Sequence, residues 1–230
     1  MQISTKHTTA ILVFAQSSKE ESRRKGIVGG TLLFDSLTKR TLEVVRKTKL
    51  PYFHLTEAEQ IGTTFSERFT NAIQSVFDQG FENIVTVGND TPQLRSSNIV
   101  SAVTKLNERR SVIGPSADGG FYLMGLHKSN FNPTTFKELP WQTADLYRAL
   151  TDVLMLSGSR IFRLSTYFDL DDFSDLRLFS NRFGHYSKKL LKLISALLTG
   201  TKESHFHFTR LFDSLLSFTF FNKGSPHIGA

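Results

Sequence analysis

Three acidic segments each follow a run of residues that predicts a β-strand. Asp90 comes after the apolar run 83–87, Asp118 follows 111–113, and the acids at 169–172 follow 160–164. In parallel α/β sheets, ligand sites lie beyond the carboxyl ends of the strands. Carboxylate oxygens suit Mg²⁺ or Mn²⁺, and such a cation can neutralise charge on a departing nucleoside diphosphate. These strand ends are therefore the candidate site.

Each acidic segment also has an ordinary structural explanation. Thr91 or Asp90 could cap a helix that opens at Pro92, and this interpretation and the functional one are equally supported. Asp118 and Gly119 lie between two apolar runs, which is also a hairpin signal. Acids at 169–172 suit the start of a helix, where the helix dipole favours negative charge. For Asp118 the turn is the favoured interpretation of the segment taken alone. For 169–172 the structural interpretation is favoured unless the other two segments converge on it.

Strands and helices alternate along most of the chain. This alternation predicts an α/β fold with a mixed, mostly parallel sheet flanked by helices. We expect residues 16–30 to form a loop. The strands are expected at 9–15, 51–55, 83–87, 111–113, 121–126 and 160–164, and the helices at 31–48, 65–79, 92–107, 142–156 and 173–183.

Composition narrows the classes of function. The chain has 230 residues, no cysteine and a formal net charge of +7. The lack of cysteine excludes disulfides, thiolate zinc sites, iron–sulfur clusters and thiol catalysis. The charge favours anionic partners, but no aromatic-basic motif or helix-turn-helix pattern supports nucleic acid. No apolar run approaches the ~18 residues of a membrane span. We expect a cytoplasmic protein.

The last part of the chain differs from the rest. A leucine-rich stretch at 190–198 is flanked by lysines, Gly200 is expected to end its helix, and the tail beyond it is rich in phenylalanine. We therefore divide the chain into a domain at 1–184 and a helical extension at 185–230. The extension is expected to pack on the domain or to form a homodimer surface. Peripheral contact with an anionic membrane is a less favoured alternative.

Five motifs stand in a characteristic order. They are Phe65-Ser-Glu67-Arg68, Gly88-Asn-Asp90-Thr-Pro92, Gly114-Pro-Ser-Ala-Asp118-Gly-Gly-Phe-Tyr-Leu, Leu139-Pro-Trp141 and Asp169-Leu-Asp171-Asp172. Over residues 9–180 this order resembles a bacterial family of GT-A-fold, glycosyltransferase-like proteins, often labelled radical-SAM/selenodomain-associated transferases. The family is similar, more distantly, to the 2-phospholactate and molybdenum-cofactor guanylyltransferases.

The resemblance implies a nucleotide-diphospho-sugar transferase fold and roles for the acids. Asp90 would bind a Mg²⁺ or Mn²⁺ ion that bridges a nucleotide diphosphate, with Asp169 or Asp171 near that metal. Asp118, with Gly119 and Gly120, would line the donor-sugar or acceptor side. Asp118 is our candidate for orienting or deprotonating the acceptor hydroxyl.

Other residues would complete the pocket. Glu67 and Arg68 would open the helix that borders the nucleotide. The basic residues Arg23, Arg24 and Lys25 could grip phosphates. They stand where family members often have a Pro-Gly-x-x-Lys-Thr-Arg-Leu loop, although the Pro-Gly and the spacing differ here.

Two aromatic side chains are further candidates. Tyr122 could reach the cleft from its strand, and Trp141, the only tryptophan, could stack on a base or a sugar. A structural role beside Pro140 is equally compatible with Trp141.

Together these features favour an enzyme. Our leading hypothesis is a metal-dependent glycosyltransferase with a nucleotide-diphosphate-sugar donor. The first alternative is a nucleotidyltransferase that joins a nucleoside triphosphate to a phosphorylated small molecule and releases pyrophosphate. The second is a catalytically degenerate binding or scaffold protein of the same fold, which the altered phosphate loop suggests.

Overall fold

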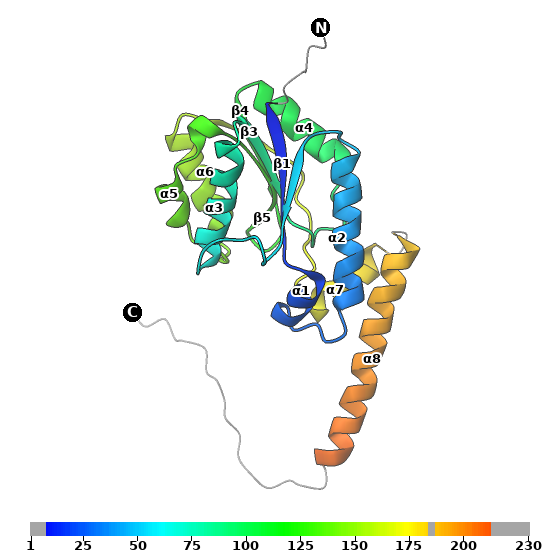
Figure 1. Ribbon diagram of the computed structural model, residues 1–230. Coiled ribbons are helices and arrows are strands. Elements are labelled where there is room, and N and C mark those ends of the chain that lie inside the picture. The colour runs from blue at the N-terminus through cyan, green and yellow to red at the C-terminus, as the bar shows by residue number, and fades with distance from the viewer. Residues whose placement is uncertain (1–7, 184–186, 213–230) are drawn as a thin grey trace, which may run out of the picture.

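A central six-stranded sheet organises the chain (Figure 1). The computed structural model describes residues 8–183 and 187–212, with side chains as far as residue 200. The strands are β1 (Thr9–Phe14), β2 (Tyr52–Leu55), β3 (Asn83–Val87), β4 (Arg110–Pro115), β5 (Phe121–His127) and β6 (Arg160–Arg163). Their order across the sheet is β2-β1-β3-β5-β4-β6.

Five of the six strands run in the same direction. β1 pairs in parallel with β2 and β3, and β4 pairs in parallel with β6. Only β5 runs the other way, because it is antiparallel to both β3 and β4. The carboxyl ends of β1, β3, β4 and β6 consequently meet at one edge. The mixed, mostly parallel sheet expected from the sequence is confirmed.

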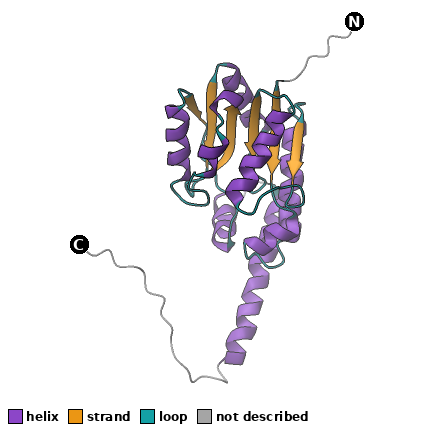
Figure 2. Ribbon diagram, turned by 60° about the vertical axis from the view of Figure 1, so that its left-hand side comes forward, coloured by secondary structure: helices purple, strands orange, loops and turns teal. Residues whose placement is uncertain are grey.

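Helices cover both faces of the sheet (Figure 2). The helical segments are α1 (Ser18–Arg24), α2 (Thr31–Arg46), α3 (Phe65–Asp78), α4 (Ser96–Asn107), η1 (Lys128–Asn130), α5 (Pro133–Lys137), α6 (Leu146–Leu156), α7 (Phe173–Arg182) and α8 (Lys188–Phe212). One core packs α3, α5 and α6 against the sheet. The other packs α4 and the end of α2 against the opposite face. Alternate side chains of the central strands are therefore buried on both faces.

A third apolar cluster lies below the sheet in Figure 1. There Ile27 and Phe34 pack with Leu176 of α7 and with Leu190 and Ile194 of α8. The far part of α8 continues away from the sheet. No helix in the described part of the chain is both long and apolar enough to cross a membrane.

Four local expectations were wrong, and one of them is the helix expected from residue 142, which begins only at Leu146. Residues 18–24 form helix α1 instead of a loop, because Ser17 caps the backbone N–H of Glu20. The helix expected from Pro92 begins only at Ser96. Helix α8 passes through Gly200, where we expected it to end. A helix-interior glycine costs only about 1 kcal/mol, which a long apolar helix can tolerate. The phenylalanine-rich residues beyond 212 lie outside the described residues.

Candidate functional site

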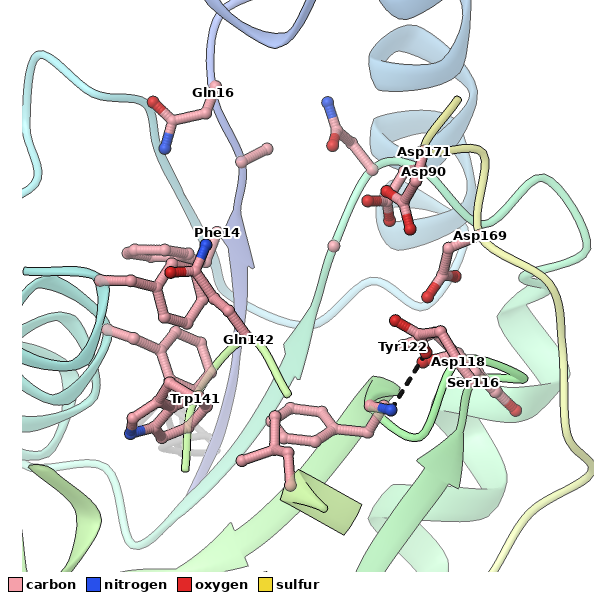
Figure 3. Close-up of a pocket in the computed structure, with 18 of the residues that line it drawn as sticks. Phe14, Gln16, Asp90, Ser116, Asp118, Tyr122, Trp141, Gln142, Asp169 and Asp171 are labelled. Carbon is pink, nitrogen blue, oxygen red and sulfur yellow. Dashed lines mark hydrogen bonds between the residues drawn. The ribbon is translucent and has the colours of Figure 1, made fainter. Parts of the chain in front are cut away.

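A pocket of about 670 Å³ opens at the carboxyl edge of the sheet. Its lining has two different sides (Figure 3). We call one the polar wall; its side chains are Glu21, Arg24, Lys25, Asp90, Ser116, Asp118, Asp169 and Asp171. We call the other the aromatic wall; its side chains are Phe14, Phe65, Phe69, Phe121 and Trp141.

Backbone hydrogen bonds bring the three acidic segments together. The N–H of Leu170 donates to the carbonyl of Asp90 at 3.0 Å, so the chain after β6 lies against the end of β3. The N–H of Ala117 donates to the carbonyl of Tyr167 at 2.9 Å and joins the ends of β4 and β6. The convergence that would favour a functional interpretation is therefore present. Asp90 does not cap a helix, since the N-cap of α4 is Arg95.

Lys25 lies at the centre of the polar wall. Its Nζ is 2.7 Å from Asp90 Oδ2, 2.8 Å from Asp171 Oδ1 and 3.0 Å from Glu21 Oε1. It also donates to the carbonyl of Leu170 at 3.1 Å. Only 12% of its side chain is exposed. Burial alone would lower the pKa of Lys25, but the three carboxylates outweigh burial and raise it well above its usual value. Lys25 is therefore a fixed positive charge.

The carboxylates around Lys25 outnumber the positive charges. Burial raises the pKa of Glu21 and Asp171, although Lys25 opposes the rise. Asp169 lies beside this group and accepts a hydrogen bond from the Thr91 hydroxyl. Burial, with the nearby charge of Asp90, raises the pKa of Asp169 to about 8. The surroundings of Asp169 therefore favour its protonated form.

Asp118 has a different environment. It lies in the turn between β4 and β5, so the hairpin interpretation is correct, and it is exposed to solvent. Its Oδ1 accepts from the N–H of Gly120 at 3.0 Å (Figure 3). The turn is fixed by the Tyr147 N–H, which donates to the carbonyl of Gly119 at 2.9 Å. An exposed carboxylate on a fixed turn is suitably placed to meet a ligand.

Tyr122 is held by its neighbours in the fold. Its hydroxyl donates to the carbonyl of Ser165 at 3.0 Å, and its ring stacks on Tyr167 at 4.7 Å. Burial raises its pKa above the usual value. Tyr122 belongs to the pocket lining, but its hydroxyl already has a partner.

The aromatic wall is a set of interlocked rings. Phe69 lies 5.0 Å from Phe14 and 5.2 Å from Trp141, measured between ring centroids. Phe65 lies 5.5 Å from Trp141. The Trp141 indole N–H donates to the carbonyl of Phe136 at 2.7 Å, so the ring has a fixed orientation. Such a surface suits stacking by a planar or apolar ligand group.

Some predicted site residues do not line the pocket. Arg23 pairs with Glu20 and has 71% of its side chain exposed. Glu67 closes a capping box with Thr64 at the start of α3. Arg68 donates to the carbonyl of Thr63. In contrast, Arg24 does line the pocket, although it also pairs with Glu20.

Sequence reasoning missed several pocket residues. The most important is Glu21, which lies four residues before Lys25 and so pairs with it along α1. The pattern Ser17-x-x-Glu20 was a signal for the start of this helix. Phe14 and Phe69 fall within an expected strand and an expected helix, but neither was expected at the site.

The carboxylates do not fit a divalent cation as they are arranged here. Among the described residues, no three His, Cys, Asp or Glu side chains form a group that could hold a metal ion. Asp90 and Asp171 have the hard oxygen ligands that Mg²⁺ or Mn²⁺ requires, but both contact the ammonium of Lys25.

Part of the sequence matches a family of bacterial proteins. Residues 37–143 match the model of a family described as "Uncharacterized protein conserved in bacteria (DUF2064)". The DUF2064 match includes Asp90, Asp118 and Trp141, and it ends before Asp169 and Asp171. Among curated proteins, none matches the sequence.

Solved structures identify the fold. A crystal structure described as a "putative nucleotide-diphospho-sugar transferase" from Desulfovibrio desulfuricans G20 is 24% identical and has a TM-score of 0.70. The match covers 84% of this chain and 98% of that one. The nucleotide-diphospho-sugar transferase fold implied by the motifs is therefore confirmed.

Two other solved structures are more remote. A CMP:2-keto-3-deoxy-manno-octonic acid synthetase complexed with CTP is 11% identical, with a TM-score of 0.46 over 78% of this chain and 100% of that one. A cytidylyltransferase from Leptospira borgpetersenii serovar Hardjo-bovis (strain JB197) is 13% identical, with a TM-score of 0.43 over 85% and 96%.

Proposed function

We propose that this chain is a glycosyltransferase that uses a nucleotide-diphosphate-sugar donor. The observation that carries the proposal is the two-walled pocket at the carboxyl edge of the sheet. The aromatic wall would receive the planar base or another apolar part of the donor. The polar wall would receive the sugar and the acceptor hydroxyl.

The proposed reaction is a group transfer. An acceptor hydroxyl oxygen bonds to the anomeric carbon while the bond from that carbon to the diphosphate breaks, and the nucleoside diphosphate leaves with the bonding electrons. Asp118 would orient the hydroxyl and take its proton, because it is the exposed carboxylate of the polar wall. Arg24 would face the negative charge of the diphosphate, since it is the pocket's basic residue on the solvent side of α1.

The resemblance also implies a Mg²⁺ or Mn²⁺ ion at Asp90, Asp169 and Asp171. That ion would stabilise the departing diphosphate. Lys25 engages two of these carboxylates, so the proposed steps depend on the protein's own residues alone.

The test is thermal unfolding with a panel of nucleoside diphosphates, their sugar conjugates and nucleoside triphosphates. A ligand at about 100 times its Kd stabilises the folded state by about 2.7 kcal/mol. For a chain of this size that is a rise in Tm of roughly 5–10 °C. We expect such a rise for one base, and we expect Arg24→Ala to reduce it.

Arg23→Ala is the matched control. Both arginines pair with Glu20 from the same helix, but only Arg24 lines the pocket. If no nucleotide raises the Tm, the transferase proposal fails and the degenerate binding protein is favoured. If Arg23→Ala and Arg24→Ala reduce the rise equally, the nucleotide does not bind in this pocket.

Product analysis separates the two enzyme classes. Release of a nucleoside diphosphate from a sugar donor supports the glycosyltransferase. Release of pyrophosphate from a nucleoside triphosphate supports the nucleotidyltransferase instead.

A further inference from the structure

Lys25 has the surroundings of a bound cation. Its Nζ has four oxygen atoms within 3.1 Å, namely three carboxylate oxygens and the Leu170 carbonyl. These oxygens come from three separate segments: α1, the chain after β3 and the chain after β6. An ammonium group with three donors is thus enclosed by more acceptors than it needs.

The backbone around Lys25 is anchored on its other side. Ser22 Oγ donates to the carbonyl of Ile27 at 2.6 Å, and Ile27 is fully buried in the apolar cluster with α7 and α8. The Lys25 Nζ also lies 5.5 Å from the centroid of the buried Phe34 ring. An ordinary helix pair, Lys39 with Asp35, has 67% of its lysine exposed. Lys25 is therefore part of the core of the site.

We propose that Lys25 is the resident cation of this site, occupying the place between Glu21, Asp90 and Asp171 that a divalent cation would need. The Lys25 ammonium and a divalent cation cannot share the same oxygens, because their positive charges repel each other and both would need the same carboxylates as ligands. A divalent ion would also need ligand distances near 2.0–2.6 Å, closer than these oxygens lie to the ammonium. This proposal has one consequence that rests on the proposed function: the nucleotide binds without a divalent cation.

The first experiment titrates Mn²⁺ alone, without nucleotide, and follows the free ion by electron paramagnetic resonance. The variants are the wild type, Lys25→Met and the control Lys19→Met. Lys19 is an exposed residue of the same helix. We expect Lys25→Met to bind Mn²⁺ at least tenfold more tightly than the wild type and Lys19→Met.

Two results would overturn the proposal. One is a wild type that binds Mn²⁺ as tightly as Lys25→Met. The other is a Lys25→Met variant that folds but binds no Mn²⁺, because a divalent ion would then not fit between these carboxylates even without the lysine. If Lys25→Met does not fold, the charge-balanced Lys25→Met/Glu21→Gln double variant replaces it, with the same expected gain. Asp90 and Asp171 remain in that variant as ligands.

The second experiment measures nucleotide affinity of the wild type in EDTA and in Mn²⁺. We expect the two Kd values to agree within about twofold. Nucleotide binding that appears only with Mn²⁺ contradicts the proposal. A lack of binding in both conditions contradicts the proposed function instead, while the Mn²⁺ titration still decides the role of Lys25.

Discussion

The two walls of the pocket are built in different ways. Polar-wall residues such as Asp90 and Asp171 lie in the segments that follow β3 and β6, and ion pairs with Lys25 join them. Aromatic-wall residues such as Phe14 and Phe69 are continuous with the apolar core between the sheet and α3. One wall is held by charge and the other by packing.

This difference separates stability from chemistry. Removing a buried ring removes contacts in every direction and leaves a cavity. Removing an exposed carboxylate such as Asp118 leaves the surrounding packing intact. We therefore expect the aromatic wall to dominate the free energy of unfolding, whereas the polar wall determines which ligand and which pH the protein accepts.

The largest expected effect is that of Phe69→Ala. Phe69 is 4% exposed and contacts Phe14, Phe65, Phe121 and Trp141. Truncating it should lower the free energy of unfolding by about 3–5 kcal/mol, measured by urea denaturation. Leu156→Ala is the control, because Leu156 is 88% exposed and should cost less than about 0.5 kcal/mol. Similar losses for the two variants would show that packing does not hold this wall.

A somewhat smaller effect is expected where the walls are joined. Gly119 has φ +95°, and a Cβ atom there would lie 2.3 Å from the carbonyl oxygen of Ala144. Gly119→Ala therefore combines backbone strain with a clash against the segment that follows Trp141. We expect a loss of about 3 kcal/mol in the same measurement.

Gly158→Ala is the matched control for that position. Gly158 has φ +82°, but nothing lies within 4 Å of the added Cβ. Gly158→Ala should lower the free energy of unfolding only through the strain of that backbone conformation, by about 1 kcal/mol. If Gly119→Ala costs no more than Gly158→Ala, the turn is free to move away from Ala144 and the walls are not rigidly joined.

The sequence predicted the polar wall better than the aromatic wall. Asp90, Asp118 and the acids at 169–171 were recognisable because each follows a predicted strand within a few residues, and such segments lie at the sheet edge. Phe69 was recognisable only as a buried residue of a helix with a 3.6-residue period. Periodicity identifies the face that a residue occupies, but not whether that face opens into a pocket.

The position of the Lys25 ammonium group was the least predictable part of the site. Lys25 and Glu21 lie in a charged segment whose composition suggests a loop, so the pairing along α1 was not foreseen. Their meeting with Asp90 and Asp171 depends on the order of the strands, which brings the ends of β1, β3 and β6 to one edge. Spacing within the sequence does not contain that information.

The smallest of the expected effects on stability concerns the pH dependence of the polar wall. The pKa of Asp169 is raised to about 8, whereas an aspartate in the unfolded chain titrates near 3.9. Between these values the folded state holds a proton that the unfolded state has lost. Unfolding therefore releases a proton, and stability should fall as the pH rises from about 4 to about 8. Asp169→Asn removes this titration.

We therefore expect the stability of Asp169→Asn relative to the wild type to increase between pH 5 and pH 6. The change should be about 1.4 kcal/mol, since each pH unit between the unfolded and folded pKa values changes the difference by about that amount. The asparagine can still accept the hydrogen bond from Thr91, so the comparison isolates the proton. The cost of Phe69→Ala should stay constant over the same range, because no titrating group is removed from the aromatic wall. A relative stability of Asp169→Asn that is equal at both pH values would mean that the Asp169 carboxyl titrates normally, and a pH-dependent cost of Phe69→Ala would mean that the two walls are coupled.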